Sequence, residues 1–394
     1  MGFESSEYQE RLQRLHQTLL EKQADLAILS QNADIYYYSG SSAPLYLAVP
    51  AEGEPFLIAR KAVERIAGDA PQLKLEIFNG SKDLKAIFER HGLNAAKRIG
   101  LTLDTITYAS VQRLLELFPG SAPVDLSWEI RALRMVKSEA EIAIQAKAGV
   151  IMGGIAELVR TCFKPGITEI ELSALVEGFM RIQGHTGLVR CRREGIEIGL
   201  GVCSSGRNSL AGTKFDGVCA GAGISAAAPY GSGFKRIVQG EPVTLDYAFN
   251  LDGYLVDQTR MLIWGEPEAE VTVAYKAMAA IQQAVFETMK PGTGWSEVYD
   301  LAVNLAREFG YEREFMGLGP EKVCFVGHGI GLELDEPPFV AANQKLCFEA
   351  GMVVAIEPKV ALPGIGVVGI EDTVVIRPNG VERLTKCLSE LILV

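Results

Sequence analysis

The chain has 394 residues, of which 48% are hydrophobic and 22% are charged, so it can bury a full core and is not expected to be disordered. Its net charge of −11 (38 basic against 49 acidic residues) argues against nucleic acid or an anionic membrane surface as a partner. No uninterrupted apolar run of about 18 residues predicts a membrane span. Seven cysteines without a CxxC pair are expected to be reduced thiols in a cytoplasmic protein.

The first part of the chain alternates between helical and strand-like segments. Residues 7–29 begin with a helical pattern of leucines and end in a strand-like stretch. Three β-rich runs follow at DIYYYSG (34–40), LYLAVP and EPFLIA, each near glycine or proline. Further helices and strands alternate to about residue 130, which predicts a small N-terminal α/β domain.

A long helical stretch over 129–162 is interpreted as the connector into a second domain. Its early part is charged and its later part is apolar, so the boundary is placed near residue 135. The predicted domains are therefore 1–135 and 136–394. The fold class is α/β in the N-terminal domain and mixed α+β in the whole chain.

The second domain opens with a recognisable helix start. Thr168 is the predicted N-cap of a helix over 167–183, and Glu171 completes a capping box. The remaining segments are predicted as glycine-rich β structure over 185–264, as helices over 268–290 and 295–310, and as strands alone over 352–394.

The segment EPVTLDYAFNLDGYLVDQTRMLIWG predicts a β-hairpin, because two β-rich runs flank Asn-Leu-Asp-Gly. Asp246 and Asp257 are equally far from a turn centre between residues 251 and 252, so the pair is predicted to face each other across the ladder. Directly opposed Cβ atoms lie about 4.5–5.5 Å apart. Two such carboxylates need a divalent metal or a shared proton between them.

The segment GMVVAIEPKVALPGIGVVGIEDTVVI predicts a second hairpin of the same kind. Glu357 and Glu371 are equally far from Gly364, which lies in the predicted turn Leu-Pro-Gly-Ile-Gly. Both glutamates lie in otherwise apolar runs, where a lone carboxylate is costly to bury. One pair alone would be read as hairpin residues that face solvent, but two matched pairs favour a shared site.

His328 lies between these hairpins in VGHGIGLELDEPP, and its flanking glycines allow the backbone to approach closely around the imidazole. Carboxylates with one histidine are typical ligands for adjacent divalent ions such as Mn, Co or Zn. Two such ions can hold a bridging hydroxide and polarise a carbonyl. The predicted ligands are Asp246, Asp257, His328, Glu357 and Glu371.

The motifs LDYAFNLDGYLVDQTR, GHGIGLELDEPP, AIEP and GIEDT resemble those of the pita-bread metallopeptidases, which include prolidase, aminopeptidase P, methionine aminopeptidase and creatinase. The resemblance covers nearly the whole chain and implies a creatinase-like N-terminal domain before a pita-bread catalytic domain. It also implies that Asp257 and Glu371 bridge two metal ions, that Glu357 is the catalytic proton carrier, and that the protein is a homodimer.

The substrate residues that the family usually carries are changed. Asp335 stands where prolidases have a second histidine, and Phe339 stands where they often have an arginine. Pro229 and Tyr230 stand where the family has Pro-His, so Tyr230 is a candidate replacement donor, and His185 is a candidate imidazole from elsewhere in the chain. Loss of an oxyanion donor costs about 10²–10³ in rate where nothing replaces it.

Three hypotheses follow from this pattern. The first is a dimetal hydrolase of the Xaa-Pro dipeptidase or aminopeptidase P type, which cleaves an N-terminal amide bond of a small peptide. The second is a non-peptidase hydrolase or lyase for a small cationic compound, and the third is an inactive metal-binding homologue. No dinucleotide cofactor is expected, because GAGISA (221–226) matches that fingerprint without the acidic partner that a βαβ unit needs.

Overall fold

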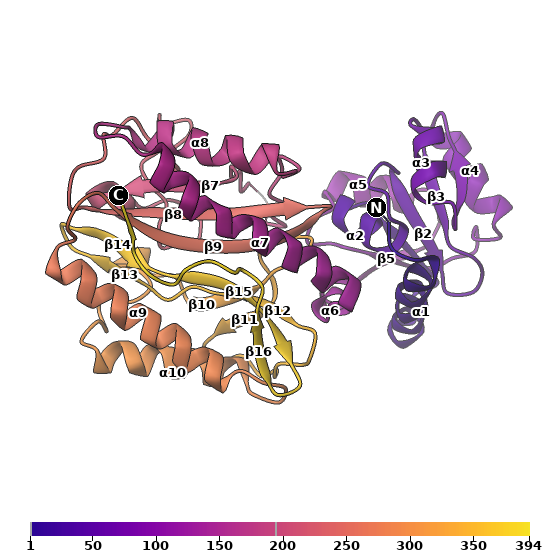
Figure 1. The fold of residues 1–394 in the computed structure, drawn as a ribbon. Coiled ribbons are helices and arrows are strands. Elements are labelled where there is room, and N and C mark those ends of the chain that lie inside the picture. Colours follow the sequence, from indigo (N-terminus) through magenta and orange to yellow (C-terminus); the bar gives the residue numbers. More distant parts are fainter. Residues whose placement is uncertain (1, 194) are drawn as a thin grey trace. The chain divides into compact units, whose positions relative to one another are not determined.

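The computed structural model describes residues 2–193 and 195–394. The chain forms two compact units, Met1–Arg134 and Met135–Val394, each with its own sheet and hydrophobic core (Figure 1). The predicted mixture of helices and strands in both parts of the chain is confirmed.

The N-terminal unit is built around one mixed sheet in the strand order β4-β3-β2-β1-β5-β6. Its core lies between this sheet and the helices that follow the strands, with Phe56, Phe88 and Phe118 almost fully buried. The elements are α1 (Ser5–Lys22), β1 (Leu26–Leu29), α2 (Asn32–Ser39), β2 (Tyr46–Pro50), β3 (Phe56–Ala59), α3 (Val63–Asp69), β4 (Lys74–Ile77), α4 (Ser81–Arg90), β5 (Arg98–Leu101), α5 (Tyr108–Leu115), β6 (Ala122–Asp125) and α6 (Ser127–Met135).

The prediction of β structure for DIYYYSG is wrong, because this segment forms helix α2. The Gln31 side chain accepts a hydrogen bond from the Ala33 N–H at the start of the helix, and Gly40 ends it with a φ of 84°. Tyr37 and Tyr38 are buried in the core. Capping and burial therefore outweigh the intrinsic β preference of three tyrosines.

The C-terminal unit has a larger sheet in the order β11-β10-β12-β15-β9-β8-β7, with β16 on β15 and β17 on β9. Helices α7 and α8 lie on one side of this sheet and α9 and α10 on the other (Figure 1). The elements are α7 (Glu139–Cys162), α8 (Glu169–Ile182), β7 (Gly201–Ser205), β8 (Pro242–Leu251), β9 (Tyr254–Ile263), α9 (Ala269–Thr288), α10 (Trp295–Glu308), β10 (Phe325–Gly329), β11 (Glu336–Ala341), β12 (Val353–Ile356), β13 (Lys359–Leu362), β14 (Gly366–Gly369), β15 (Glu371–Arg377), β16 (Gly380–Arg383) and β17 (Ile392–Leu393).

The predicted helix over 129–162 is broken into α6 and α7. Ser138 caps the new helix start, where its hydroxyl accepts from the Glu141 N–H and the Glu141 carboxylate accepts from the Ser138 N–H. The predicted capping box of Thr168 and Glu171 is confirmed at the start of α8. The strands predicted over 352–394 are also confirmed, as β12 to β17.

Helix α7 is long and apolar enough to cross a membrane by length and composition, although charged residues interrupt its apolar run. In the structure it packs against β8 and β9. The buried Gln145 amide donates to the carbonyls of Leu255 and Ile330. This arrangement is that of a helix in the core of the C-terminal unit.

The β8–β9 hairpin turns at Asp252 and Gly253, whose φ angles of 49° and 93° are those of a type I′ turn. The predicted register is wrong, because Asp246 pairs with Thr259 and Asp257 pairs with Ala248. The turn centre lies one residue later than expected. The two aspartates are therefore diagonal neighbours rather than directly opposed, but they still lie on one face of the ladder.

The second hairpin has the predicted register. Ile356 pairs with Asp372 in the β12–β15 ladder, and Lys359 pairs with Gly369 in the β13–β14 ladder. Glu357 and Glu371 lie between these pairs in the same register, centred on Gly364. The flanking pairs thus have the register that opposed glutamates require.

Candidate metal centre

Three of the predicted ligands form a compact, buried group in the C-terminal unit. Asp257 of β9, His328 of β10 and Glu371 of β15 each offer a ligand atom, and these atoms all lie within 4.8 Å of one another. The three residues are 7%, 6% and 1% exposed, respectively. One nitrogen and carboxylate oxygens from separate strands of one sheet fit a single divalent ion of the transition-metal type.

The other two predicted ligands, Asp246 and Glu357, are held by a buried lysine. The Lys359 Nζ lies 2.9 Å from Asp246 Oδ2, 2.8 Å from Glu357 Oε2 and 2.9 Å from Glu371 Oε2. Glu357 Oε1 lies 3.7 Å from His328 Nε2. The structure therefore brings all five predicted ligands together, with one ammonium group among them.

Several neighbours fix the position of Glu371. The Thr259 hydroxyl donates to Glu371 Oε2 at 2.7 Å, and the buried Arg260 guanidinium donates to the Glu371 carbonyl at 2.7 Å. Arg260 Nη2 also donates to Asp372 Oδ1 at 2.6 Å, and the Thr385 hydroxyl donates to the same Asp372 oxygen. Partners of this kind orient a metal ligand before any ion arrives.

The pKa values of the buried groups reflect the crowding of negative charge. Burial raises the pKa of Asp246, the Lys359 ammonium opposes this, and Glu371 adds to it. Burial and the charges of Glu371 and Asp246 raise the pKa of Asp257 well above its usual range. Burial lowers the pKa of Lys359, but the charges of Asp246, Glu357 and Glu371 outweigh that effect and raise it well above its ordinary value. A cation bound at Asp257 would release the proton that this crowding favours.

Phe339 lies directly beside the histidine of the site, because His328 and Phe339 are partners in the β10–β11 ladder. Its side chain is half-buried. An aromatic ring at this position supplies apolar surface next to the candidate ligand, and it supplies no charge for a substrate carboxylate.

Asp335 and Tyr230 both lie near Cys191. Burial, and then the charges of Asp335, Glu333 and Asp257, raise the pKa of the Cys191 thiol to about 12. Burial raises the pKa of Tyr230, and the charge of Cys191 raises this pKa further. The two candidate substrate residues thus share one neighbourhood, and the charge of Asp257 extends into it.

His185 has a structural environment. Its Nε2 lies 3.1 Å from the Ala248 carbonyl and its Nδ1 accepts from the Gly187 N–H at 2.8 Å, while burial lowers the pKa of the ring. The side chain is 2% exposed. With both ring nitrogens bonded to backbone, His185 has none left for a substrate in this arrangement, contrary to its prediction as a substrate-binding residue.

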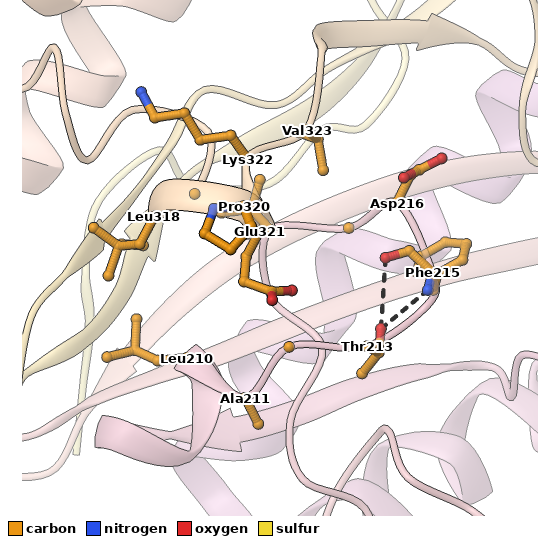
Figure 2. A pocket seen from close by; sticks show the side chains of 15 residues that line it. Leu210, Ala211, Thr213, Phe215, Asp216, Leu318, Pro320, Glu321, Lys322 and Val323 are labelled. Carbon is orange, nitrogen blue, oxygen red and sulfur yellow. Dashed lines mark hydrogen bonds between the residues drawn. The ribbon is translucent and has the colours of Figure 1, made fainter.

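A separate pocket lies between the loop 211–218 and the segment 317–323 (Figure 2). The Thr213 hydroxyl accepts from the Phe215 N–H at its edge. None of the predicted site residues is among the described residues that line it. Ala361 of β13 does line it, two residues along the strand from Lys359, so the pocket is a neighbour of the metal centre and not part of it.

The sequence analysis missed Lys359 and Thr259, although a signal for both is present. Successive residues of a strand point to opposite faces, so residues two apart share a face. Lys359 follows Glu357 by two residues and Thr259 follows Asp257 by two. Extending the alternation by one step from each carboxylate would have placed both side chains at the site.

Comparisons with known proteins find similarity along nearly the whole chain. Residues 143–378 match the model of metallopeptidase family M24, and residues 11–136 match the creatinase/prolidase N-terminal domain. The chain is 28% identical to the Xaa-Pro dipeptidase of Pyrococcus horikoshii over 392 residues, which cover 97% of this chain and 99% of that protein.

Solved structures extend the similarity to the fold. The prolidase structure from Pyrococcus horikoshii aligns with a TM-score of 0.81 at 26% identity, covering 97% of this chain and 99% of that chain. The structure of an Xaa-Pro dipeptidase from Bacillus anthracis aligns with a TM-score of 0.82 at 26% identity, covering 98% and 100%. The resemblance to the pita-bread family is confirmed. The chain belongs to metallopeptidase family M24, as a metallopeptidase-like hydrolase with a creatinase-type N-terminal domain.

Proposed function

We propose that the protein hydrolyses an N-terminal amide bond in small peptides, as an Xaa-Pro dipeptidase does. The observation that carries this proposal is the convergence of Asp257, His328 and Glu371 in a buried group, with Glu357 beside it. The names of the full-length relatives support a peptide substrate.

The residues present fit one divalent ion at Asp257, His328 and Glu371. When bound there, such an ion would polarise an amide carbonyl and lower the pKa of water. The choice among Mn, Co and Zn is set by affinity and availability, and carboxylates with one histidine suit all three. The second ion that the resemblance implies does not have an equally open place, because the Lys359 ammonium is bonded to Asp246 and Glu371.

Glu357 is the residue we assign to proton transfer. Its Oε2 accepts a hydrogen bond from Lys359, whereas its Oε1 lies on the side of His328. Oε1 can therefore take a proton from an attacking water and return it to the leaving amine. Positioned general acid–base groups contribute about 10²–10⁴ in rate.

The test is turnover of Ala-Pro and Ala-Pro-Phe by protein reconstituted with Mn²⁺ or Co²⁺. We expect Glu357→Gln to lower kcat by about 10²–10⁴, while the exposed Glu349→Gln retains wild-type activity as the matched control. Equal turnover in Glu357→Gln and wild type would refute the assigned role. A metal-loaded wild type that cleaves neither peptide would refute the peptidase proposal.

A second candidate function is that of a non-peptidase hydrolase or lyase that acts on a small cationic compound. The half-buried Asp335, whose charge acts on the same thiol as Asp257, favours a positively charged group near the site. Phe339 offers no positive charge to a peptide carboxylate. Turnover of small amines but of neither peptide would favour this candidate, and a protein that turns over none of these compounds would fit the inactive homologue.

The cytoplasmic location, which the cysteine pattern predicts, and the homodimer, which the family resemblance implies, stay predictions. Cell fractionation and mass measurement in solution would test them.

A further inference from the structure

Lys359 has the surroundings of a bound cation. Its ammonium lies at 2.8–2.9 Å from three carboxylates that come from β8, from the end of β12 and from β15. An ammonium has three N–H donors, and these three oxygens match that number. The Lys359 side chain is 2% exposed, and those of Glu357 and Glu371 are 8% and 2% exposed, so water has little access to these two contacts. The Asp246 side chain is more open, at 21% exposed.

The backbone makes room for this lysine. Lys359 pairs with Gly369 across the β13–β14 ladder. A Cβ atom at Gly369 would lie 2.4 Å from Lys359 Cγ and 2.7 Å from Lys359 Cα. The glycine therefore lets the lysine chain cross the strand toward the carboxylates, and any larger residue at position 369 would displace it.

The carboxylates divide between two cations. Asp257, His328 and Glu371 form a group that an ion can occupy, and Asp246 is not in that group. Asp246 Oδ2 instead accepts from Lys359. A second divalent ion at Asp246 would have to share Asp246 and Glu371 with an ammonium already bonded to both. Two cations held by the same oxygens in a buried site repel each other strongly.

We propose that Lys359 takes the place of the second metal ion, so that the site binds one divalent cation, at Asp257, His328 and Glu371. This inference deepens the proposed function, since it concerns the same centre. An ammonium neutralises carboxylates and donates hydrogen bonds, but it accepts no electron pair. The lysine can therefore replace one of the two positive charges of the second ion and none of its Lewis acidity.

The test counts ions and does not depend on turnover. Metal-free protein is titrated with Mn²⁺ in a calorimeter, and the bound metal is measured by elemental analysis after desalting. We expect one ion per chain for the wild type and two for Lys359→Ala. The matched control is Lys345→Ala, an exposed lysine on the loop after β11, which should still bind one ion.

A second variant, Gly369→Ala, tests the proposal without substituting the lysine, and a Mn²⁺ spectrum gives a second readout. Gly369→Ala pushes the lysine out of its place and is expected to raise the count above one. The Mn²⁺ electron paramagnetic resonance spectrum should show an isolated ion in the wild type and an exchange-coupled pair in Lys359→Ala.

The wild-type count decides the matter even where a variant fails to fold. Two tightly bound ions per wild-type chain, or none, would overturn the proposal, and so would an unchanged count in a folded Lys359→Ala. One ion with the expected spectrum, but without peptide turnover, would support this inference and refute the proposed function alone.

Discussion

Thr259 holds the carboxylate of the candidate ligand Glu371 in place. Its hydroxyl donates to Glu371 Oε2 at 2.7 Å, and it is the ladder partner of both Asp246 and Glu371. The side chain is fully buried. Because Glu371 is shared by the ion group and Lys359, a shift of its carboxylate would affect both cations.

We therefore expect Thr259→Val to weaken metal binding by about 10–100-fold and to lower the free energy of unfolding by about 1–3 kcal/mol. Valine keeps the shape of the side chain and removes only the donor. Calorimetric titration with Mn²⁺ and urea unfolding of the metal-free protein measure the two effects.

The control for this substitution is Thr272→Val on α9, where the hydroxyl bonds only to its own helix in an exposed place. It should change neither quantity. An unchanged Mn²⁺ affinity in Thr259→Val would show that Glu371 is held by its other partners.

At the residue scale, the sequence contains most of the centre. Spacing about a turn identified the carboxylates, and the flanking glycines identified His328. Asp246 and Asp257 were placed on the correct face although their register was wrong, because the error was two residues along the ladder and alternation has a period of two. The sequence does not predict Lys359 at the site, because a lysine is ordinarily expected to point into water. Its burial follows from Gly369 on the opposite strand, which leaves room for the lysine chain.

At the element scale, the β8–β9 turn sets the relative position of two candidate site residues. Gly253 adopts a φ of 93°, which is costly for any residue with a Cβ atom. Its N–H also donates to the Asn250 side chain at 3.0 Å. The turn therefore fixes the register that makes Asp246 and Asp257 diagonal neighbours.

We expect Gly253→Ala to lower the free energy of unfolding by about 1–2 kcal/mol, as measured by the urea midpoint. The matched control is Gly178→Ala in α8, where a Cβ would meet nothing within 4 Å. That substitution should raise stability by about 0.5–1 kcal/mol. Equal effects of the two substitutions would mean that the turn tolerates another register.

Elements were predicted well where pattern and capping agreed, as in α8 and β12 to β15. They were predicted poorly where tertiary contacts decide. The tyrosine run of α2 resembles a strand in isolation, and only its buried position and its caps make it helical. The break between α6 and α7 depends on Ser138, whose capping role competes with a continuous helical pattern.

At the scale of the whole molecule, the two units have separate cores. The candidate metal ligands all belong to Met135–Val394. A ligand that binds the folded state of one unit stabilises that unit by mass action, by about 2.7 kcal/mol at a concentration 100 times the Kd. None of the three residues of the ion group comes from the N-terminal unit.

Scanning calorimetry is therefore expected to show two transitions, of which Mn²⁺ raises only the one assigned to the C-terminal unit. Limited proteolysis assigns the transitions by identifying which unit resists digestion between them. A single transition that shifts as a whole on addition of Mn²⁺ would show that the two units unfold together.

The buried lysine has a consequence for how the protein responds to its surroundings. A free ion obeys mass action, so its occupancy falls whenever its concentration in the cell falls. Lys359 is joined to the chain by covalent bonds, and dilution cannot remove it from Asp246, Glu357 and Glu371. One of the three positive charges that would balance this centre is thus fixed in the chain itself, and only the two carried by a divalent ion vary with the supply of metal.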